Sequence, residues 1–469
     1  MKKTDNFFIP PFNSRRINGR YLVSNRLCGW DFLAPDEFRQ LNALGLARAT
    51  PLFARLRSRG LVADADNVRQ LIRDFRSVNT NLFADTSLHI AVVTTRCNLQ
   101  CSYCQARVPE GRDMSLEVAR QVLRYLEDVR NPHVTLELQG GEPLVNWPVA
   151  KFLIEGARRL GRPGKNVTVS LVSNLTLLDE AKMRVLADND VKVCTSLDGP
   201  ADIHDRHRVL PNGRGTYRVV TGKAREFSKK FGRQVSFLPT ITAASLRHPR
   251  QIVDEYVRQG QTQISLRPVN NMGGAECGWE ALGYSPEAFQ RFYRVAMEHI
   301  LELNRKGVEM HERMARVILT KVLAKKDPMF VDLMNPCGAG RAQMAYMPDG
   351  GCFPCDEARM VGGDMFKLGN ILQDRYQDMM SSDKLLYLLQ ASCADIAQYA
   401  SPFIPWTGYC PVVNYALQHN VVSKTRCSSA FKILDFQFEY IFGKLEEGGW
   451  AAEVFRRWAE RGAGTKDPR

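Results

Sequence analysis

The chain has 469 residues, of which 44% are apolar and 24% charged, and its formal net charge is +14. This length exceeds what one hydrophobic core usually organises, so we expect two or three domains. No run approaches the roughly 20 apolar residues that cross a bilayer and no secretory signal is found, so we expect a soluble, cytoplasmic protein without a membrane partner, whose twelve cysteines stay reduced.

Net charge alone does not identify a partner, because basic surfaces attract nucleic acid, acidic peptides and anionic membranes alike. Two interpretations stay open: a footprint for a macromolecule, or solubility combined with a site for an anionic ligand. The sequence contains no long basic run with interleaved aromatic residues. We therefore do not expect a nucleic-acid partner.

Residues 1–82 are predicted to form a small α+β module. Residues 20–24 and 28–33 have the composition of short strands, and Pro35 opens a helical stretch that a second helix follows over residues 51–59. This order favours a winged-helix-like fold. We interpret the module as a peptide-binding domain.

Residues 83–310 alternate apolar runs of strand length with amphipathic helices, which is typical of βα units around a parallel sheet. Six strands are expected, over residues 88–93, 134–138, 167–172, 191–195, 235–241 and 263–266. Helices are expected over residues 115–129 and 216–231, and a last one begins at Ser285 and ends near Gly307. Six units are fewer than the eight of a complete barrel, so we predict an α/β fold with a partial, open (β/α)6 TIM-like barrel and its chemistry at the carboxyl ends of the strands.

Residues 311–445 differ from the barrel, because cysteine and glycine become frequent and periodicity weakens. A helix is expected over residues 428–445. Residues 446–469 are interpreted as a C-terminal tail that ends in a polar stretch from Gly462. We therefore expect a third, cysteine-containing domain after the barrel.

Three cysteines follow the first predicted barrel strand: Cys97, Cys101 and Cys104, spaced Cys-x3-Cys-x2-Cys. Three thiolates on one loop can bind three irons of a cubane cluster and leave the fourth iron open for an outside ligand. Zinc and three unrelated buried thiols are the weaker alternatives, since structural zinc needs a fourth Cys or His and His89 is expected to lie in the core. We predict a four-iron four-sulfur cluster.

This triplet, with the aromatic Tyr103 just before its third cysteine, resembles the hallmark of the radical S-adenosylmethionine (SAM) superfamily. The next three predicted strands end in further motifs that resemble GGEP, a Ser-Asn pair and the SxDGPxxxHDxxR signature of the peptide-modifying branch. Alone each is weak, since a Gly-Gly pair after a strand is more often a tight turn, but their order and placement agree. The resemblance implies a SAM site formed by Tyr103, Gly140, Gly141, Glu142, Pro143, Ser173, Asn174, Ser196, Asp198 and Arg208.

The resemblance also implies roles for single residues. Glu142 would receive the amino group of the methionine moiety. Ser173 and Asn174 would contact the ribose and the methionine carboxylate, and Arg208 would pair with that carboxylate. An electron from a donor such as flavodoxin or ferredoxin would enter the cluster, and SAM cleavage would give methionine and a 5'-deoxyadenosyl radical that takes a hydrogen atom from the substrate.

The later cysteines resemble the opening of the SPASM domain, which holds auxiliary iron-sulfur clusters in peptide and protein maturases. By this resemblance Cys337, Cys355 and Cys410 would hold one auxiliary cluster, and Cys352 is either a fourth ligand or a buried thiol. Asp356 matches the general base of the related anaerobic sulfatase maturases, with a turn or capping aspartate as the alternative.

Part of the SPASM pattern is missing. Gln398, Ser401 and Thr407 stand where three further thiolates would be, and neutral amide and hydroxyl groups are poor ligands for soft clusters. We therefore expect the second auxiliary cluster to be absent. Cys393 is interpreted as a core thiol, and the alternative is that it replaces one of the missing ligands. Cys427 takes the place of the last cysteine of the pattern. The remaining cysteines are expected to be structural: Cys28, Cys194 and Cys277.

Over nearly its whole length the chain resembles the His-Xaa-Ser system maturases, most visibly in residues 21–25, 32–35 and 355–360. This resemblance implies a peptide substrate and a paired radical SAM partner protein. Our first hypothesis is a peptide-modifying radical SAM enzyme whose N-terminal module binds a leader segment. The alternatives are a formylglycine-type sulfatase maturase, a nucleic-acid-modifying radical enzyme and a non-catalytic partner of another maturase.

Overall fold

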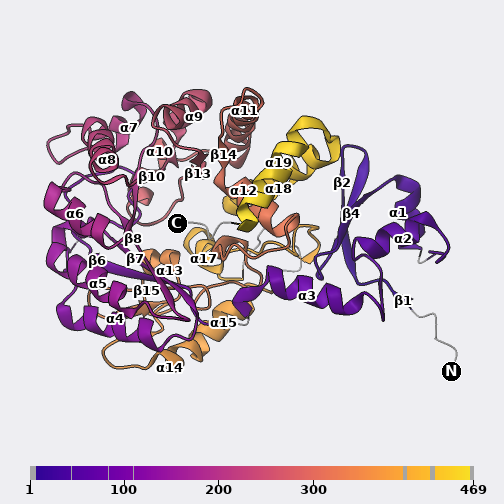
Figure 1. The fold of residues 1–469 in the computed structure, drawn as a ribbon, viewed down its shortest axis with the longest axis horizontal. Helices are drawn as coiled ribbons and strands as arrows, with labels where there is room; N and C mark the ends of the chain where they lie inside the picture. Colours follow the sequence, from indigo (N-terminus) through magenta and orange to yellow (C-terminus); the bar gives the residue numbers. More distant parts are fainter. Residues whose placement is uncertain are drawn as a thin grey trace.

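The computed structural model describes residues 7–43, 45–82, 84–108, 110–394, 399–422 and 428–464. Figure 1 shows the N-terminal module at one end of the molecule and the barrel at the other. Helices α18 (Ser429–Glu447) and α19 (Gly449–Gly464) lie between them. Within the described residues, no helix has the length and apolar character needed to span a membrane.

Five of the predicted barrel strands form one parallel sheet in the order β10-β9-β8-β7-β6. They are β6 (Leu88–Thr94), β7 (His133–Gly140), β8 (Asn166–Val172), β9 (Lys192–Ser196) and β10 (Val235–Leu238). The sixth, β12 (Gln263–Ile264), instead pairs with β14 (His311–Glu312). Nearby, β11 (Thr240–Ile241) pairs with β13 (Arg267–Pro268). The main sheet therefore stays open after β10, which confirms the partial α/β barrel.

Amphipathic helices cover the sheet where the sequence predicts them. Helices α4 (Leu116–Asp128), α8 (Tyr217–Phe231) and α11 (Pro286–Arg305) fall within the expected ranges. Ser115 and Ser285 cap α4 and α11, because each side chain accepts a backbone N–H bond in the first turn. The other barrel helices are α5 (Trp147–Leu160), α6 (Glu180–Asp188), α7 (Ala201–His207), α9 (Pro249–Arg258) and α10 (Trp279–Leu282).

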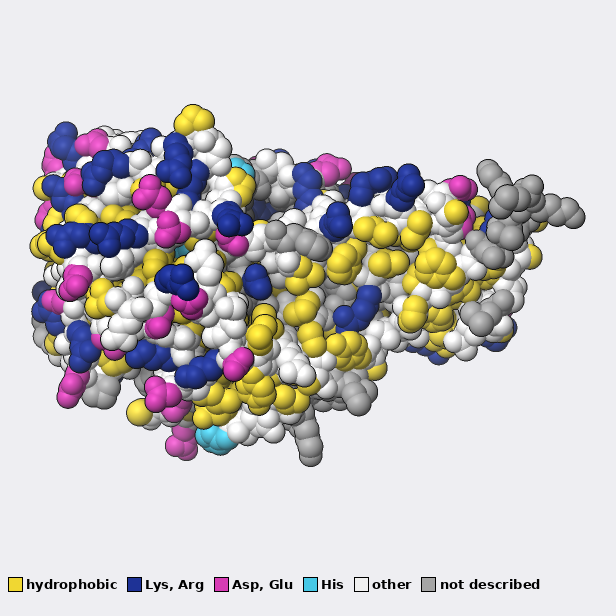
Figure 2. Space-filling model, turned by 90° about the horizontal axis from the view of Figure 1, so that it is seen from below, with side chains coloured by type: hydrophobic (Ala, Val, Ile, Leu, Met, Phe, Trp, Pro, Cys, Tyr) yellow, Lys and Arg dark blue, Asp and Glu magenta, His cyan; other side chains and the backbone are white. Residues whose placement is uncertain are grey.

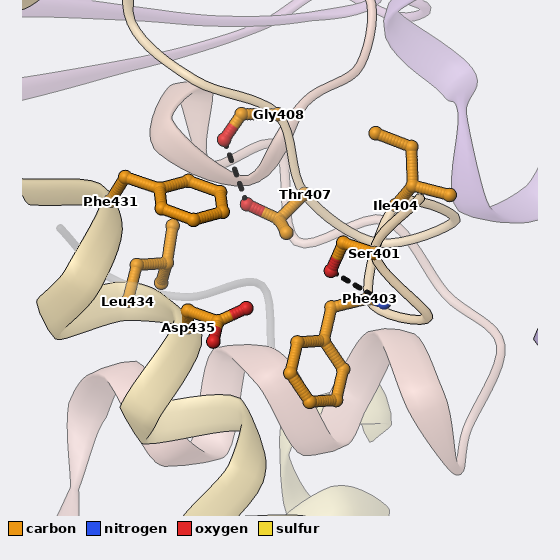
Figure 3. A pocket seen from close by; sticks show the side chains of 8 residues that line it. All are labelled: Ser401, Phe403, Ile404, Thr407, Gly408, Phe431, Leu434 and Asp435. Atoms are coloured by element: carbon orange, nitrogen blue, oxygen red, sulfur yellow. Dashed lines mark hydrogen bonds between the residues drawn. The ribbon is translucent and has the colours of Figure 1, made fainter. Parts of the chain in front are cut away.

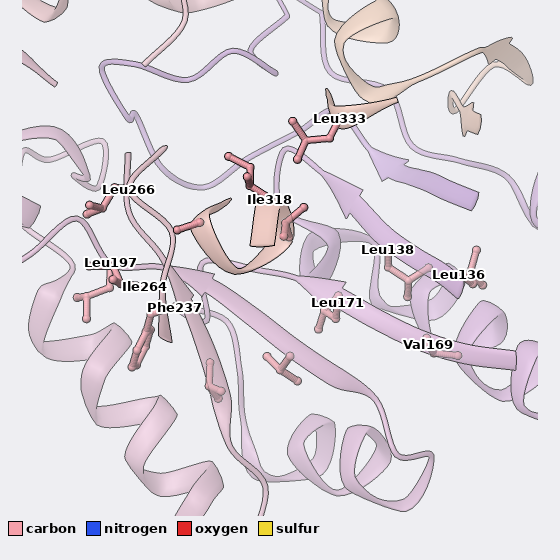
Figure 4. Close-up of a cluster of buried hydrophobic side chains, with 14 of the residues drawn as sticks. Leu136, Leu138, Val169, Leu171, Leu197, Phe237, Ile264, Leu266, Ile318 and Leu333 are labelled. Atoms are coloured by element: carbon pink, nitrogen blue, oxygen red, sulfur yellow. The ribbon is translucent and has the colours of Figure 1, made fainter. Parts of the chain in front are cut away.

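Alternation along β7 divides its side chains between two environments. Leu136 and Leu138 join the apolar core together with Leu171 of β8, as Figure 4 shows. The intervening Glu137 and Gln139 are half-buried and polar, and Gln139 is bonded to a side chain of the C-terminal region. The side of β7 that faces the C-terminal region is therefore polar.

Three strands of the C-terminal region extend the barrel sheet beyond β6, which the sequence analysis did not predict. Strand β15 (Gln343–Tyr346) runs parallel to β6, and β16 (Gly351–Phe353) and β17 (Gly369–Asn370) follow in antiparallel order. These strands are too short for alternation to reveal them. The region's helices are α12 (Arg313–Val322), α13 (Asp356–Val361), α14 (Tyr376–Met380), α15 (Asp383–Ala391) and α17 (Pro411–Gln418).

The N-terminal module contains an antiparallel sheet in the order β2-β3-β4. Strands β3 (Arg20–Asn25) and β4 (Trp30–Leu33) and helices α1 (Pro35–Asn42) and α2 (Pro51–Ser58) lie where they were expected. Four elements of the module were not predicted: β2 (Phe12–Ile17), α3 (Val68–Val78) and the short pair β1 (Phe7–Phe8) and β5 (Ala63–Asp64).

The segment from residue 446, expected as a tail, is mostly helical instead. Helix α19 packs against α12, and its Phe455 and Trp458 are buried. These apolar residues recur at helical spacing among Arg and Glu side chains, so the polar composition was misleading. Residues 465–469 lie outside the described part of the chain.

Candidate active site at the mouth of the barrel

The cysteine loop leaves the end of β6 and lies against the turn that follows β7. Gly141 N donates to Thr94 O at 2.8 Å, and Glu142 N donates to Arg96 O at 2.8 Å. A Cβ atom on Gly140 would lie 2.2 Å from Thr94 O, and one on Gly141 would lie 2.3 Å from Arg96 O. The two glycines are therefore required for the close approach of the two backbones.

Residues after β9 hold the same loop from the other side. Gln100 N donates to Val209 O at 2.8 Å, and Ser102 N donates to His207 O at 3.1 Å. The Ser102 hydroxyl and His207 Nδ1 are 2.8 Å apart. The loop thus bridges the carboxyl ends of strands on both sides of the barrel mouth.

The three thiols of the loop lie close enough for their charges to interact. Burial, together with the charges of Glu142, Cys101 and Cys104, raises the pKa of Cys97 to about 11. Leu99 N donates to Cys97 Sγ at 3.4 Å. Because crowded, desolvated thiolates are costly without a cation, this donor set fits a cluster whose irons carry the compensating charge.

Glu142 is completely buried at the start of the GGEP-like turn. Its carboxylate accepts bonds from Leu144 N at 3.0 Å, Ser173 Oγ at 2.8 Å and Asn174 N at 2.7 Å. Burial raises the pKa of Glu142 despite these donors. Pro143, the next residue, begins a short 3-10 helix.

The side chains of the predicted Ser-Asn pair at the end of β8 form hydrogen bonds with other residues of the protein. Ser173 Oγ donates to Glu142 and also accepts from Leu175 N at 3.0 Å. Asn174 Nδ2 donates to Asn98 Oδ1 at 2.9 Å, inside the cysteine loop. The pair therefore fixes the carboxylate and the loop in one arrangement.

Tyr103, Asp198 and Arg208 form a buried network behind the loop. Tyr103 donates its hydroxyl hydrogen to Asp198 Oδ2 at 2.6 Å and accepts from Arg208 Nη1 at 2.9 Å. Among the described residues, Arg208 Nε is buried and has no hydrogen-bond partner. Such an orphaned donor fits a site that receives an acidic group from a ligand. Ser196 ends β9, close in sequence to Asp198.

Two parts of this site had no predicted role: His204, the histidine of the SxDGPxxxHDxxR signature, and a glycine pair after β13. His204 Nδ1 accepts from Asp198 N at 3.4 Å, and burial lowers the pKa of His204 to about 3, so a neutral imidazole holds the turn. The glycine pair at the start of the 3-10 helix Gly273–Gly278 packs on the loop, since a Cβ on Gly274 would lie 2.5 Å from Cys104 O. Cys277 of this segment is exposed.

A second group of thiols lies in the C-terminal region. Cys355 caps α13 and accepts from Ala358 N at 3.4 Å, and Cys410 caps α17 and accepts from Val413 N at 3.5 Å. Burial raises the pKa of Cys355, and the charges of Glu357, Cys410 and Cys337 raise it further. Cys337 also receives a backbone hydrogen bond, and burial raises its pKa to about 12.

These three thiols fit a cluster site. Each receives a backbone N–H bond, as a thiolate ligand would. Asn414, one helical turn after Cys410, has a buried Nδ2 without a hydrogen-bond partner among the described residues. No three Cys, His, Asp or Glu side chains within the described part of the chain are gathered closely enough to hold a single metal ion.

Cys352 lies on the opposite face of the sheet from Cys337 and Cys355. It belongs to the main barrel core with Tyr346, whereas the other two thiols share a separate apolar cluster with Phe353. Its Sγ donates to Gly350 O at 3.5 Å.

The other cysteines have varied surroundings. Cys393 Sγ donates to Asn335 Oδ1 at 3.7 Å, and its charge interacts with that of Cys337. Cys28 is buried and Cys194 is partly exposed. Cys427, like Gln398, lies outside the described residues.

Phe403 and Phe431 lie beside two of the three positions without a cysteine ligand, Ser401 and Thr407 (Figure 3). Ser401 Oγ accepts from Phe403 N at 3.2 Å, and Thr407 Oγ1 donates to Gly408 O at 3.2 Å. The void beside them holds about 10 Å³, roughly the room of one water molecule. Phe403 stacks on Phe438 with ring centres 5.1 Å apart. The hydroxyl groups at these two positions are engaged in local hydrogen bonds, and neutral hydroxyls are poor ligands for a cluster.

Asp356 is the first residue of α13 and lies next to the cysteine that caps it. Its Oδ1 accepts from Arg359 Nε at 2.7 Å, and its side chain is 14% exposed. The neighbouring Glu357 has a pKa raised to about 7, first by burial and then by the charges of Asp332 and Asp356. Asp356 is thus an ion-paired residue in acidic surroundings.

Comparison with known proteins identifies the family to which the barrel region belongs. Residues 91–255 match the model of the Radical SAM superfamily. The chain is 26% identical over 312 residues to the cysteine-type anaerobic sulfatase-maturating enzyme of Clostridium perfringens, covering 64% of this chain and 80% of that protein. It is also 26% identical over 187 residues to the serine-type enzyme of Klebsiella aerogenes, covering 38% and 45%.

Two solved structures show the same fold. The enzyme anSMEcpe, with bound AdoMet and the Kp18Cys peptide, superimposes with a TM-score of 0.63 at 21% identity, over 78% of this chain and 100% of that chain. Streptococcus suis SuiB, bound to the precursor peptide SuiA, gives 0.54 at 13% identity, over 89% and 98%. Residues 91–255 therefore form a radical SAM domain, and this protein is a radical SAM enzyme that uses a [4Fe-4S] cluster and S-adenosylmethionine.

Proposed function

We propose that this radical SAM enzyme modifies a residue of a peptide substrate, and that Cys97, Cys101 and Cys104 hold its SAM-binding cluster. The observation that carries the proposal is the convergence of the cysteine loop, the Gly140 turn and Arg208 at one barrel mouth. When bound, the cluster and SAM supply a 5'-deoxyadenosyl radical, which takes a hydrogen atom from the substrate.

The residues around the loop orient SAM and exclude water. Glu142 accepts a hydrogen bond from the amino group of SAM. Within the described residues only Asn174 N donates to its Oε2, and a carboxylate oxygen can accept more than one hydrogen bond. Arg208 receives the methionine carboxylate through its orphaned Nε. Ser173 and Asn174 act by positioning Glu142 and the loop. The walls of the SAM site are Tyr103, Gly140, Gly141, Pro143, Ser196 and Asp198.

One auxiliary cluster on Cys337, Cys355 and Cys410 is part of the same proposal. The N-termini of α13 and α17, capped by two of these thiols, favour a negatively charged cluster. We assign Cys352 to the core, since it lies on the other face of the sheet. Asp356, beside the cluster, accepts the proton released when the substrate radical is oxidised. We propose that the second auxiliary cluster is absent, because Ser401 and Thr407 carry neutral hydroxyls in place of thiolates.

As substrate we propose a peptide with His-Xaa-Ser repeats, whose leader segment binds near the N-terminal module. A hollow of about 430 Å³, lined by Arg15 of β2, Glu287 of α11 and Lys432 of α18, has room for such a segment. Over the barrel end of the face in Figure 2, Lys and Arg side chains are interspersed with Asp and Glu, whereas hydrophobic side chains cover much of the other end. This spread suits a peptide better than a nucleic-acid stripe. A flavodoxin or ferredoxin as electron donor and a paired radical SAM protein complete the proposal.

A formylglycine-type sulfatase maturase is the second candidate. It is favoured by the 26% identity to the cysteine-type sulfatase-maturating enzyme of Clostridium perfringens. The two candidates share the radical chemistry and differ in the peptide.

Anaerobic reconstitution tests the proposal. We expect the Cys97→Ala/Cys101→Ala/Cys104→Ala variant to lose about four irons, the content of one cubane cluster, and to form no 5'-deoxyadenosine. Mass spectrometry of a His-Xaa-Ser peptide and of a cysteine-containing sulfatase peptide then separates the two substrates. If the iron-loaded wild type forms no 5'-deoxyadenosine, the protein is a non-catalytic partner and the proposal is wrong.

A further inference from the structure

Arg359 joins the two halves of the active site. It lies one turn after Cys355 in α13, and its Nε donates to Asp356 Oδ1 at 2.7 Å. Its Nη2 donates to Gln139 Oε1 at 2.7 Å, and Gln139 immediately precedes the Gly140 turn. The guanidinium is therefore fixed between the SAM-binding turn and the auxiliary cysteines.

One edge of this guanidinium has no hydrogen-bond partner among the residues that the structure describes. The Arg359 side chain is only 4% exposed. Among the described residues, Arg359 Nη1 makes no hydrogen bond. It is also not one of the fully buried polar atoms that lack a hydrogen-bond partner. Nη1 therefore keeps a small accessible surface. A nearly buried guanidinium favours an acceptor oxygen at such an edge.

The surrounding charges select the kind of acceptor. The ion pair with Asp356 already balances the charge of Arg359. Glu357 follows Asp356 in the first turn of α13, so the neighbourhood is acidic. A substrate carboxylate would be repelled here, whereas a neutral carbonyl oxygen would not.

We propose that Arg359 is a substrate-binding residue whose Nη1 donates to a neutral carbonyl oxygen of the peptide, next to the residue that loses its hydrogen atom. The inference rests on the proposed peptide-modifying function. Held by Gln139 and Asp356, the guanidinium places that residue between the radical source and the auxiliary thiols. The target site on the peptide is therefore flanked by neutral or basic residues and carries no Asp or Glu.

Binding measurements on the full-length, iron-loaded protein test this role. Two fluorescein-labelled probes are used with SAM present: a peptide of three His-Gly-Ser repeats and a cysteine-containing sulfatase peptide. Fluorescence anisotropy gives the Kd for wild type, Arg359→Lys and Arg359→Gln. We expect a Kd at least about tenfold higher in both variants, at wild-type iron content. The controls are Arg375→Lys and Arg375→Gln, which change an exposed arginine in a similar pair with Asp378.

Each outcome separates the inference from the proposed function. Unchanged affinity of both Arg359 variants for the probe that wild type binds overturns the inference and leaves the function intact. Loss of iron in both variants also overturns it, because Arg359 is then structural. If wild type binds neither probe, the proposed function fails and the inference fails with it. A probe with Ser replaced by Asp should bind wild type more weakly, and tighter binding contradicts the neutral acceptor.

Discussion

Tyr103 and Asp198 are joined by a buried hydrogen bond of 2.6 Å, which ties the cysteine loop to the end of β9. The same hydroxyl accepts a hydrogen bond from Arg208, so the Tyr103 oxygen links the carboxylate to the guanidinium. Thr240 N donates to the other carboxylate oxygen of Asp198 at 3.1 Å. The aromatic residue of the cysteine motif is therefore a structural link as well as a wall of the proposed SAM site.

Replacing Tyr103 with Phe should destabilise the protein, because the change leaves a buried carboxylate oxygen and a buried N–H without this partner. We expect the free energy of unfolding to fall by about 1–3 kcal/mol, measured by urea titration. Tyr387→Phe, at a half-exposed ring, is the control and should change it by less than about 0.5 kcal/mol. Equal stability of Tyr103→Phe and wild type would show that this bond is not important for folding.

Gly141→Ala should block assembly of the SAM-binding cluster. The new Cβ would lie 2.3 Å from the Arg96 carbonyl oxygen, and neither backbone can move without displacing the cysteine loop. We expect about four fewer irons per chain after anaerobic reconstitution. Gly222→Ala is the matched control, because nothing lies within 4 Å of its Cβ position. Full iron content in Gly141→Ala would contradict the close approach.

The sequence was sufficient for the placement of the SAM-site motifs. Strand-length apolar runs put Cys97, Gly140, Ser173 and Ser196 at the carboxyl ends of neighbouring strands, and parallel strands end on the same edge of a sheet. The hydrogen-bond partners of these residues could not be predicted from the sequence. Ser173 turned out to bond Glu142, which depends on a spacing between two strands that no local pattern encodes.

The C-terminal region was harder to predict, because its strands gain stability from β6 and not from their own composition. Cys352 and Cys355 are close in sequence, so spacing alone could not assign them to different faces. Only the pairing of Cys352 with Tyr346 in the sheet turns its thiol into the barrel core. Likewise, Arg359 gave no signal, since its partner Gln139 lies on a distant strand.

Restoring cysteines at the degenerate SPASM positions should not restore a second auxiliary cluster. In Ser401→Cys/Thr407→Cys the adjacent void of about 10 Å³ stays too small, because Phe403 and Trp406 occupy the region around Phe442. We expect wild-type iron and sulfide content after reconstitution. Cys355→Ser, measured in parallel, should lose the irons of the proposed auxiliary cluster. A gain of about four irons in the double variant would show that the aromatic packing yields to a cluster.

Stability should decrease as the pH falls from about 6.5 toward 4, partly because of His89. This imidazole is completely buried between Tyr346 and the Thr86 carbonyl, and burial lowers its pKa to about 4. An unfolded histidine titrates near 6.5. Between the two values the unfolded chain binds a proton that the folded chain does not. The free energy of unfolding therefore decreases as the pH is lowered, by up to about 1.4 kcal/mol per pH unit. Below about 4 both states are protonated and this contribution ends.

The slope of stability against pH isolates the contribution of His89 from that of the carboxylates. In His89→Gln the side chain stays polar but no longer titrates, so urea titrations between pH 4.5 and 6.5 should give a shallower slope than wild type. His419→Asn is the control, because His419 is exposed and its φ of 54° is one that asparagine tolerates. The control should keep the wild-type slope. Equal slopes for His89→Gln and wild type would mean that the buried imidazole is protonated in the folded protein.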